Sequence, residues 1–259
     1  MYKLTEFLSL LEEFAPLSLS HKMIEKGAYD NSGIIVNHHD YVERVLFCLD
    51  LNHCSVEEAV KNNCDTIVTH HPAIYNPIKS IGTSGTEVLM SAIKNGINVL
   101  SMHLNLDVAK EGRDQSLANV IGGKNIRILD LVSDDCGYGR EYEIEEADII
   151  EFVSELKGKF STDKILCYGQ GKVKTVASFC GAGSSDAVSC VKNGTITADT
   201  IITSDIAHHN LSELIESGKN VIIIPHYVAE QKGFIKFYEY VLQNCCKTKA
   251  YYFVDKRFM

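Results

Sequence analysis

An internal repeat constrains the fold of this chain more than any other feature of its sequence. The segment VERVLFCLDLNHCSVEEAVKN, residues 42–62, matches VKTVASFCGAGSSDAVSCVKN, residues 173–193, with V-x-x-V at the start and V-K-N at the end at equal spacing. Each copy is followed by an apolar DTIxT segment. A glycine-containing helix end and another apolar segment come next, KNGINVL in the first copy and ESGKNVI in the second. The order strand, helix, strand, helix, strand is therefore predicted twice.

Alternating strands and helices are typical of α/β folds, in which helices flank mostly parallel sheets. We predict two similar, internally duplicated α/β lobes, residues 1–125 and 126–259, with a C-terminal helix that is free to pack across both. The stretch between the copies ends in a predicted helix, because its apolar residues fall on one face at Ile149, Phe152, Val153 and Leu156.

Composition and patterning exclude several classes of protein. The net charge is −9, and no cluster of Lys and Arg interleaves with aromatic residues, so the chain is not expected to bind a nucleic-acid backbone. A nucleotide could still bind in one local pocket. The N-terminal segment MYKLTEFLSLLEEFAP has helical apolar spacing interrupted by glutamates, which predicts an amphipathic helix and not a signal peptide. No apolar run approaches the roughly 18 residues of a membrane span.

The chain has nine cysteines, which are scattered and include no C-x-x-C motif. An odd number of cysteines would leave an unpaired thiol in a secreted protein. We therefore predict a cytoplasmic protein in which most thiols are small buried apolar groups. A thiolate site at Cys245 and Cys246 is disfavoured, since no nearby His or Cys completes it.

Histidines and acidic residues follow the predicted strands of the first copy. His70 and His71 end the second strand and are followed by Pro72, whose fixed backbone would preorganise the pair. The third strand leads into MHLNLD, which contains His103 and Asp107. Ligands of parallel sheets bind beyond the carboxyl ends of strands, so these residues are placed where a site would form.

The second copy has a similar arrangement. Its second strand ends in TSD, and its third strand leads into PHYVAE, which contains His226 and Glu230. Each copy thus carries H-x-x-x-acid after its third strand, and in a helical turn positions i and i+4 share a face. We expect His103 with Asp107, and His226 with Glu230, each to converge on one point.

This inventory of imidazoles and carboxylates without thiolates suits divalent metals such as Zn, Mn, Fe, Co or Ni. Two carboxylates with three or more imidazoles could hold two ions side by side, and such a pair polarises water and clamps the attacked group. A lone histidine is usually structural, but three clusters at strand ends of a repeated scaffold favour metal binding.

The motifs DTIVTHHPAIY, MHLNLD and HYVAEQKG resemble those of the GTP cyclohydrolase 1 type 2 homologue family, also called the Nif-three-like family. The resemblance covers nearly the whole chain and includes LTEFLSLLEEFAP, DNSGI, GYGR and CGAGSSD. It implies two similar lobes with a dinuclear metal site in the cleft between them, and assembly into ring-like hexamers. Some members carry an inserted domain, for which this chain is too short between its lobes.

The family resemblance also implies a set of metal ligands, which are His70, His71, Asp107, His226 and Glu230. His103 matches a motif histidine at or beside the metals. The chain departs from the family pattern at IIVNHHD, where Gln-Val-Gly is frequent, and at Pro225 and Ala229, where Gly and Thr are usual. These departures remove no ligand, but they alter the residues around the pocket.

Several further residues have two interpretations. Asp50 and Asn52 follow a strand and either contact a ligand or cap a helix. His209 either contacts substrate or a metal ligand, or merely begins a helix. In CGAGSSD, Ser184 could help to bind a phosphate, although a tight turn with a serine cap is commoner. Arg140 in GYGR could bind an anion.

The segment NHHD, residues 37–40, looks like a metal cluster but precedes a strand. It should therefore lie at the opposite end of the sheet from His70 and His71, where a solvated turn is favoured. The sequence assigns no role to His38 and His39.

Our leading hypothesis is a two-metal hydrolase that attacks an electrophilic carbon of a small molecule, such as a nucleotide or a related cyclic amide-like compound. Glu230 or His103 would carry the proton. The assignment of GTP as substrate comes from the family name alone. The alternative is a non-catalytic metal-handling protein or regulatory adaptor, which needs no substrate pocket.

Overall fold

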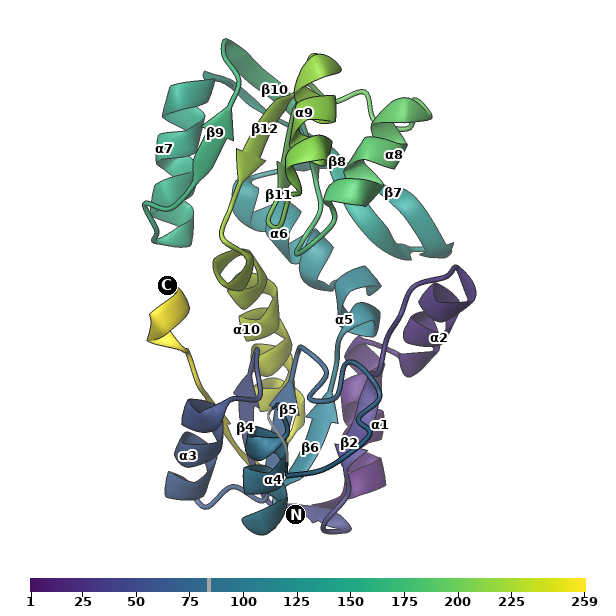
Figure 1. The fold of residues 1–259 in the computed structure, drawn as a ribbon, viewed down its shortest axis with the longest axis vertical. Coiled ribbons are helices and arrows are strands. Elements are labelled where there is room, and N and C mark those ends of the chain that lie inside the picture. Colours follow the sequence, from purple (N-terminus) through teal and green to yellow (C-terminus); the bar gives the residue numbers. More distant parts are fainter. Residues whose placement is uncertain (83–84) are drawn as a thin grey trace. The chain divides into compact units, whose positions relative to one another are not determined.

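The computed structural model describes residues 1–82 and 85–259. The chain forms a mixed α/β fold that divides into two compact units (Figure 1). Unit 1 contains Met1–Ala109 and Phe234–Arg257, and unit 2 contains Lys110–Gly233 and Phe258–Met259. The first of the two predicted lobes ends at residue 125, whereas unit 1 ends at Ala109 and unit 2 begins at Lys110. Helix α10 (His226–Asn244) supplies residues to both units.

The core of unit 1 is a five-stranded sheet in the order β13-β4-β5-β6-β2. Strands β13, β4, β5 and β6 pair in parallel, and β2 is an antiparallel edge strand. A separate antiparallel ribbon joins β1 (Tyr2–Lys3) to β3 (Tyr41–Val42). The strands of the main sheet are β2 (Gly33–Val36), β4 (Arg44–Cys48), β5 (Thr66–Thr69), β6 (Asn98–Ser101) and β13 (Lys249–Tyr252).

Strands β5 and β6 are buried along their whole length, because helices cover both faces of the unit 1 sheet. Helices α3 (His53–Lys61) and α4 (Glu87–Lys94) pack on one face. On the other face, Phe47 of β4 packs against two rings of α10, with centroid distances of 6.2 Å to Phe234 and 5.9 Å to Phe237. Burial on both sides explains why these strands have no alternation of apolar and polar residues.

The N-terminal segment forms helix α1 (Leu4–Phe14), which buries Leu4, Phe7 and Leu11. The predicted amphipathic helix is therefore confirmed. Helix α2 (Leu17–Glu25) follows it directly. Within residues 1–82 and 85–259, no helix combines the length and the apolar character that crossing a membrane requires.

Unit 2 is built on a six-stranded sheet in the order β7-β8-β10-β11-β12-β9. Only the central pairs β10–β11 and β11–β12 are parallel, so the prediction of a mostly parallel sheet is right for unit 1 and wrong for unit 2. The difference arises because a long hairpin and a short edge strand join the parallel centre. The strands are β7 (Lys124–Ser133), β8 (Cys136–Asp148), β9 (Leu166–Tyr168), β10 (Lys172–Ser178), β11 (Thr200–Thr203) and β12 (Asn220–Ile223).

Alternate residues of the parallel strands of unit 2 face opposite helical layers. In β11, Ile202 packs with α6 and α7, whereas Ile201 packs with α8 and α9. The helix predicted at Ile149 is confirmed as α7, which buries Ile149, Phe152 and Leu156. The four helices are α6 (Arg113–Ile121), α7 (Ile149–Phe160), α8 (Ser184–Lys192) and α9 (His208–Glu216).

The aspartate of each DTIxT motif ties its strand to the strand before it. In unit 1 the Asp65 carboxylate accepts hydrogen bonds from the backbone N–H groups of residues 43–44, at 2.9 and 3.0 Å. In unit 2 the Asp199 carboxylate accepts bonds from the N–H groups of residues 174–175, at 3.1 and 3.0 Å. Because both units make this contact, it explains why the aspartate occurs in both copies of the repeat.

The nine cysteines all lie in the described part of the chain and all are free thiols. Burial raises the pKa of the Cys48 thiol and raises that of Cys64 to about 12. Such thiols behave as small apolar groups, as predicted for most of them. Five are buried, namely Cys48, Cys64, Cys180, Cys190 and Cys245.

Replacement of Phe47 by alanine should lower the free energy of unfolding by about 3–5 kcal/mol, because a fully buried ring leaves a cavity. Urea unfolding followed by circular dichroism measures the change. The control Ile24→Ala removes a side chain that is 43% exposed on α2 and should change stability by about 0.5 kcal/mol or less. Equal losses in the two variants would contradict the placement of Phe47 in the core.

Candidate metal centre

The three central strands of unit 1 end level with one another. Cys48 of β4 pairs with Thr69 of β5, and Thr69 pairs with Ser101 of β6. The residues that follow these strands therefore emerge at one edge of the sheet. The chain beyond β5 is held there by backbone bonds, since the N–H of His70 donates to the Cys48 carbonyl at 3.2 Å.

Three imidazoles gather at this edge. His70, His71 and His103 each offer a ring nitrogen, and the three nitrogens lie within 4.8 Å of one another. The ring of His70 lies 4.7 Å from that of His71 and 5.0 Å from that of His103, measured between centroids. Three imidazole nitrogens at this spacing could hold a divalent metal ion.

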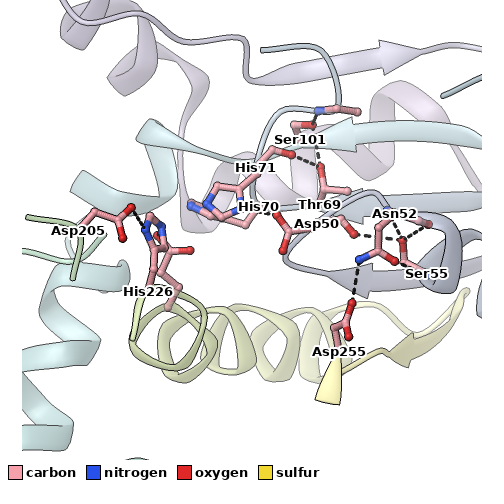
Figure 2. Close-up of polar contacts among 12 residues, drawn as sticks. Asp50, Asn52, Ser55, Thr69, His70, His71, Ser101, Asp205, His226 and Asp255 are labelled. Atoms are coloured by element: carbon pink, nitrogen blue, oxygen red, sulfur yellow. Dashed lines mark hydrogen bonds and ion pairs between the residues drawn. The ribbon is translucent and has the colours of Figure 1, made fainter. Parts of the chain in front are cut away.

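Hydrogen bonds fix which nitrogen of each imidazole faces the cluster. The Nδ1–H of His70 donates to the Met102 carbonyl at 2.9 Å, and that of His71 donates to Asp50 Oδ1 at 2.7 Å. Figure 2 shows the carboxylate of Asp50 directed at the ring of His71. With Nδ1 engaged, a neutral imidazole keeps its lone pair on Nε2, and this is how metal-ligating histidines are usually oriented.

His103 is oriented in the same way by a buried carboxylate. Its Nδ1–H donates to Asp30 Oδ1 at 2.7 Å, and Asp30 also accepts a bond from Ser32 Oγ at 2.7 Å and one from Ser20. Burial raises the pKa of the Asp30 carboxyl, but the hydrogen bonds from His103 and the two serines outweigh burial and hold the pKa below its ordinary value. The Asp30 carboxylate therefore orients the ring of His103 through its Nδ1–H.

Asp107 adds a carboxylate to the unit 1 cluster. It lies in helix α5 (Leu104–Val108), is 7% exposed, and places Oδ1 3.8 Å from His70 Nε2. That separation is too long for a hydrogen bond, but it is close to the span of an ion with two bonds of about 2.1 Å. His103 caps α5, and the Asp107 N–H donates to the His103 carbonyl at 3.0 Å, so the two residues are one helical turn apart.

In unit 2, His226 and Glu230 lie on the first turns of α10 and share a face as predicted. His226 Nε2 is 2.6 Å from Glu230 Oε1, and its Nδ1–H donates to Asp205 Oδ2 at 2.6 Å (Figure 2). Asp205 belongs to the TSD tract that follows β11. The imidazole of His226 thus has the same Nδ1 anchoring that orients the histidines of unit 1.

A buried arginine holds the carboxylate of Glu230. Arg113, in the first turn of α6, forms an ion pair with Glu230 Oε1, and both side chains are almost completely buried. The same guanidinium donates to Cys180 Sγ at 3.4 Å. At Gly181, whose φ is +75°, a Cβ atom would lie 2.9 Å from Glu230 Oε1, so only glycine lets the backbone approach the carboxylate.

Unit 2 contains three residues that were predicted to contact substrate, namely Arg140, Ser184 and His209. Arg140 is fully buried and donates to the carbonyls of Gly137 and Gly139 at 2.8 and 3.0 Å. Ser184 begins α8, is 5% exposed, and accepts a hydrogen bond from Asn210 at 3.1 Å. His209 is exposed in the first turn of α9. Roles of these residues in substrate binding stay predictions.

The two interpretations of Asp50 and Asn52 separate in the structure. Asn52 caps α3, since its Oδ1 accepts from Ser55 N at 3.0 Å, whereas Asp50 orients His71. Sequence reasoning missed the orienting roles of Asp30 and Asp50 and did not identify Arg113. Asp30 stood in the DNSGI motif, but nothing in the sequence links Arg113 to Glu230.

The sequence matches a known protein family along almost its whole length. The profile of the Duf34/NIF3 (NGG1p interacting factor 3) family matches residues 2–256. The chain is 29% identical over 251 residues to the GTP cyclohydrolase 1 type 2 homolog of Clostridium perfringens. The aligned region covers 93% of this chain and 92% of the relative.

Two solved structures are similar. The Bacillus cereus protein related to NIF3 has a TM-score of 0.85 at 18% identity and covers 99% of this chain and 98% of its own, which is evidence for the fold alone. Reduced HcgD from Methanocaldococcus jannaschii has a TM-score of 0.79 at 26% identity and covers 97% of each chain.

Replacement of Asp50 by alanine should lower the affinity for Zn²⁺ by about 10- to 100-fold, because His71 loses the partner that orients it. Calorimetric titration of metal-depleted protein measures the affinity. The control Glu57→Ala removes an exposed carboxylate from neighbouring α3 and should leave the affinity unchanged. If both variants lose affinity equally, net charge and not orientation is responsible.

Replacement of Arg113 by methionine should destabilise the metal-free protein by about 3–5 kcal/mol, because it leaves the Glu230 carboxylate buried without its guanidinium. The double variant Arg113→Met, Glu230→Gln should recover a large part of that loss, since the uncompensated charge is gone. Urea unfolding of the wild type, both single variants and the double variant gives the four free energies of unfolding that a double-mutant cycle requires. Additive losses would show that the two side chains are not coupled.

Proposed function

Because the chain belongs to the Duf34/NIF3 family, we propose that it is a dinuclear divalent-metal-binding protein with two similar, duplicated α/β lobes. One observation carries this proposal. Four imidazoles are each hydrogen-bonded through Nδ1, which directs Nε2 to the role of ligand. They belong to His70, His71, His103 and His226.

The side chains present fit a pair of borderline divalent ions. We propose that the ligands of the two ions are His70, His71 and Asp107 of unit 1 and His226 and Glu230 of unit 2. The donor set contains imidazoles and carboxylates only, which suits Zn, Fe, Mn, Co or Ni. Support comes from the 3.8 Å spacing of His70 Nε2 and Asp107 Oδ1 and from the paired His226 and Glu230.

We propose that the protein hydrolyses a small molecule, such as a nucleotide or a related cyclic amide-like compound. Divalent ions at such a site lower the pKa of water and polarise the attacked group. His103 is the side chain best suited to carry the proton, because the bond from its Nδ1–H to Asp30 orients the ring. Glu230 is less suited, because its Oε1 is already engaged by the guanidinium of Arg113.

The name of the Clostridium relative makes GTP the first substrate to test. A cytoplasmic location and a homohexamer are further parts of this proposal. The first rests on the free cysteines and the second on the family resemblance.

A second function is favoured by a different observation. Arg140 and Ser184, which were predicted to bind substrate, are buried and bonded within unit 2. A protein that stores or delivers metal ions, or that acts as a regulatory adaptor, needs ligands but no substrate-binding side chains. This alternative predicts rapid exchange of bound ions, whereas a hydrolase should hold them tightly.

Mass spectrometry of metal content should find about two ions per chain in the untagged protein, as a two-metal site requires. The double variant Asp107→Ala, Glu230→Ala should hold far fewer, because each substitution removes a ligand. The matched control Glu151→Ala, Asp163→Ala removes two exposed carboxylates of unit 2 and should keep both ions.

The same metal-loaded protein should convert GTP to a ring-opened product detectable by chromatography. Unchanged GTP at full metal occupancy would count against GTP as the substrate, and a screen of other nucleotides would follow. An absence of bound metal, even after reloading, would overturn the dinuclear proposal itself.

A further inference from the structure

The turn that joins β2 to β3 in unit 1 contains two adjacent histidines whose backbone is fixed by one buried side chain. The N–H groups of His38 and His39 both donate to Asn98 Oδ1 at 2.8 Å. The amide of Asn98, which is fully buried, in turn donates to the carbonyls of His39 and Tyr41 at 3.2 Å each. The turn is thus held in one conformation, although the rings themselves reach the surface.

The rings of His38 and His39 lie next to each other, almost at right angles. Their centroids are 4.4 Å apart with an interplanar angle of 84°, and the ring of His39 stacks on Tyr41 at 4.9 Å. A Cβ atom added at Gly96 would lie 3.3 Å from Nε2 of His38 and 3.4 Å from Nε2 of His39. Both Nε2 atoms therefore converge on the space that the missing side chain of Gly96 leaves open.

The second copy of the repeat provides an internal control. Asn220 takes the place of Asn98, and its Oδ1 accepts a hydrogen bond from the N–H of Gln170 at 3.1 Å. The turn that it holds reads Gly-Gln-Gly at residues 169–171 and contains no imidazole. At Gly218, which takes the place of Gly96, an added Cβ would meet no described atom within 4 Å. The backbone contact therefore does not require the histidine side chains.

We propose that His38 and His39 form a second metal-binding site, which takes a borderline transition-metal ion such as Ni²⁺, Cu²⁺ or Zn²⁺ between their Nε2 atoms. Neutral imidazoles are preferred ligands of these ions, with metal–nitrogen bonds of about 2.0–2.1 Å to Zn²⁺. Two ligands from the protein leave the remaining coordination positions to water, so the site is open and exchangeable.

This site is separate from the candidate metal centre. Asn98 is the first residue of β6, whereas His103 follows its last residue, Ser101. The length of β6, about 10 Å, lies between the two ends. The position at the opposite end of the sheet agrees with the prediction made from the sequence, and His38 is exposed as a solvated turn requires. The proposed site adds a bound ion to that turn.

The experiment titrates Ni²⁺ into the full chain and follows bound ions by calorimetry, in the wild type and in the variant His38→Gln, His39→Gln. The wild type should bind one more ion than the double variant. Either single variant should weaken that additional binding by about 10²-fold, because a chelate becomes a single ligand. The control His21→Gln, His53→Gln removes two exposed but separate histidines and should bind as the wild type does.

Nuclear magnetic resonance spectroscopy locates the bound ion independently of the number of ions found by calorimetry. Addition of Cu²⁺, which is paramagnetic, should broaden the backbone N–H signals of residues 37–41 and 96 in the wild type and not in the double variant. Equal binding by the double variant, or equal loss in the His21, His53 control, would overturn the proposal. The substitutions leave His70, His71 and His103 in place, so this result does not depend on the fate of the proposed function.

Discussion

The parallel register of three short strands is the constraint on which the candidate centre of unit 1 depends. Because Cys48, Thr69 and Ser101 are paired, the chain leaves the sheet three times at the same level. The residues placed there come from segments about 20 and 30 positions apart in the sequence, and only this register makes them neighbours. A shift of one residue would turn each exit toward the other face of the sheet and disperse the imidazoles.

Charge balance around the candidate ligands is achieved in different ways in the two units. In unit 1, the candidate ligands His71 and His103 donate through Nδ1 to the carboxylates of Asp50 and Asp30, which therefore lie behind the rings. In unit 2, the candidate ligand Glu230 is itself a carboxylate, and the guanidinium of Arg113 forms an ion pair with it. The buried carboxylates of Asp30 and Glu230 therefore each have a partner within their own unit, which limits the cost of burying them.

The sequence predicted the parts of this structure that leave a local pattern. The repeat, the strands at Thr66 and Thr200 and the helix at Ile149 could be predicted because they depend on apolar periodicity. The histidines at strand ends followed from the same pattern. The hairpin of β7 and β8 was not predicted, because it precedes the second copy of the repeat, which begins at residue 173, and has no counterpart in the first copy. Pairings across long separations, such as Arg113 with Glu230, leave no periodic signal at all.

The distribution of free thiols gives the chain a set of internal reporters. Cys48 and Cys64 are buried in unit 1, and Cys180 and Cys190 are buried in unit 2. A thiol-modifying reagent reacts with the thiolate, so a buried thiol with a raised pKa reacts only when its surroundings open. The rate at which each cysteine is labelled would therefore measure the opening of its own unit, without any engineered probe. Local unfolding of either unit, with and without metal, can be timed separately in the natural protein.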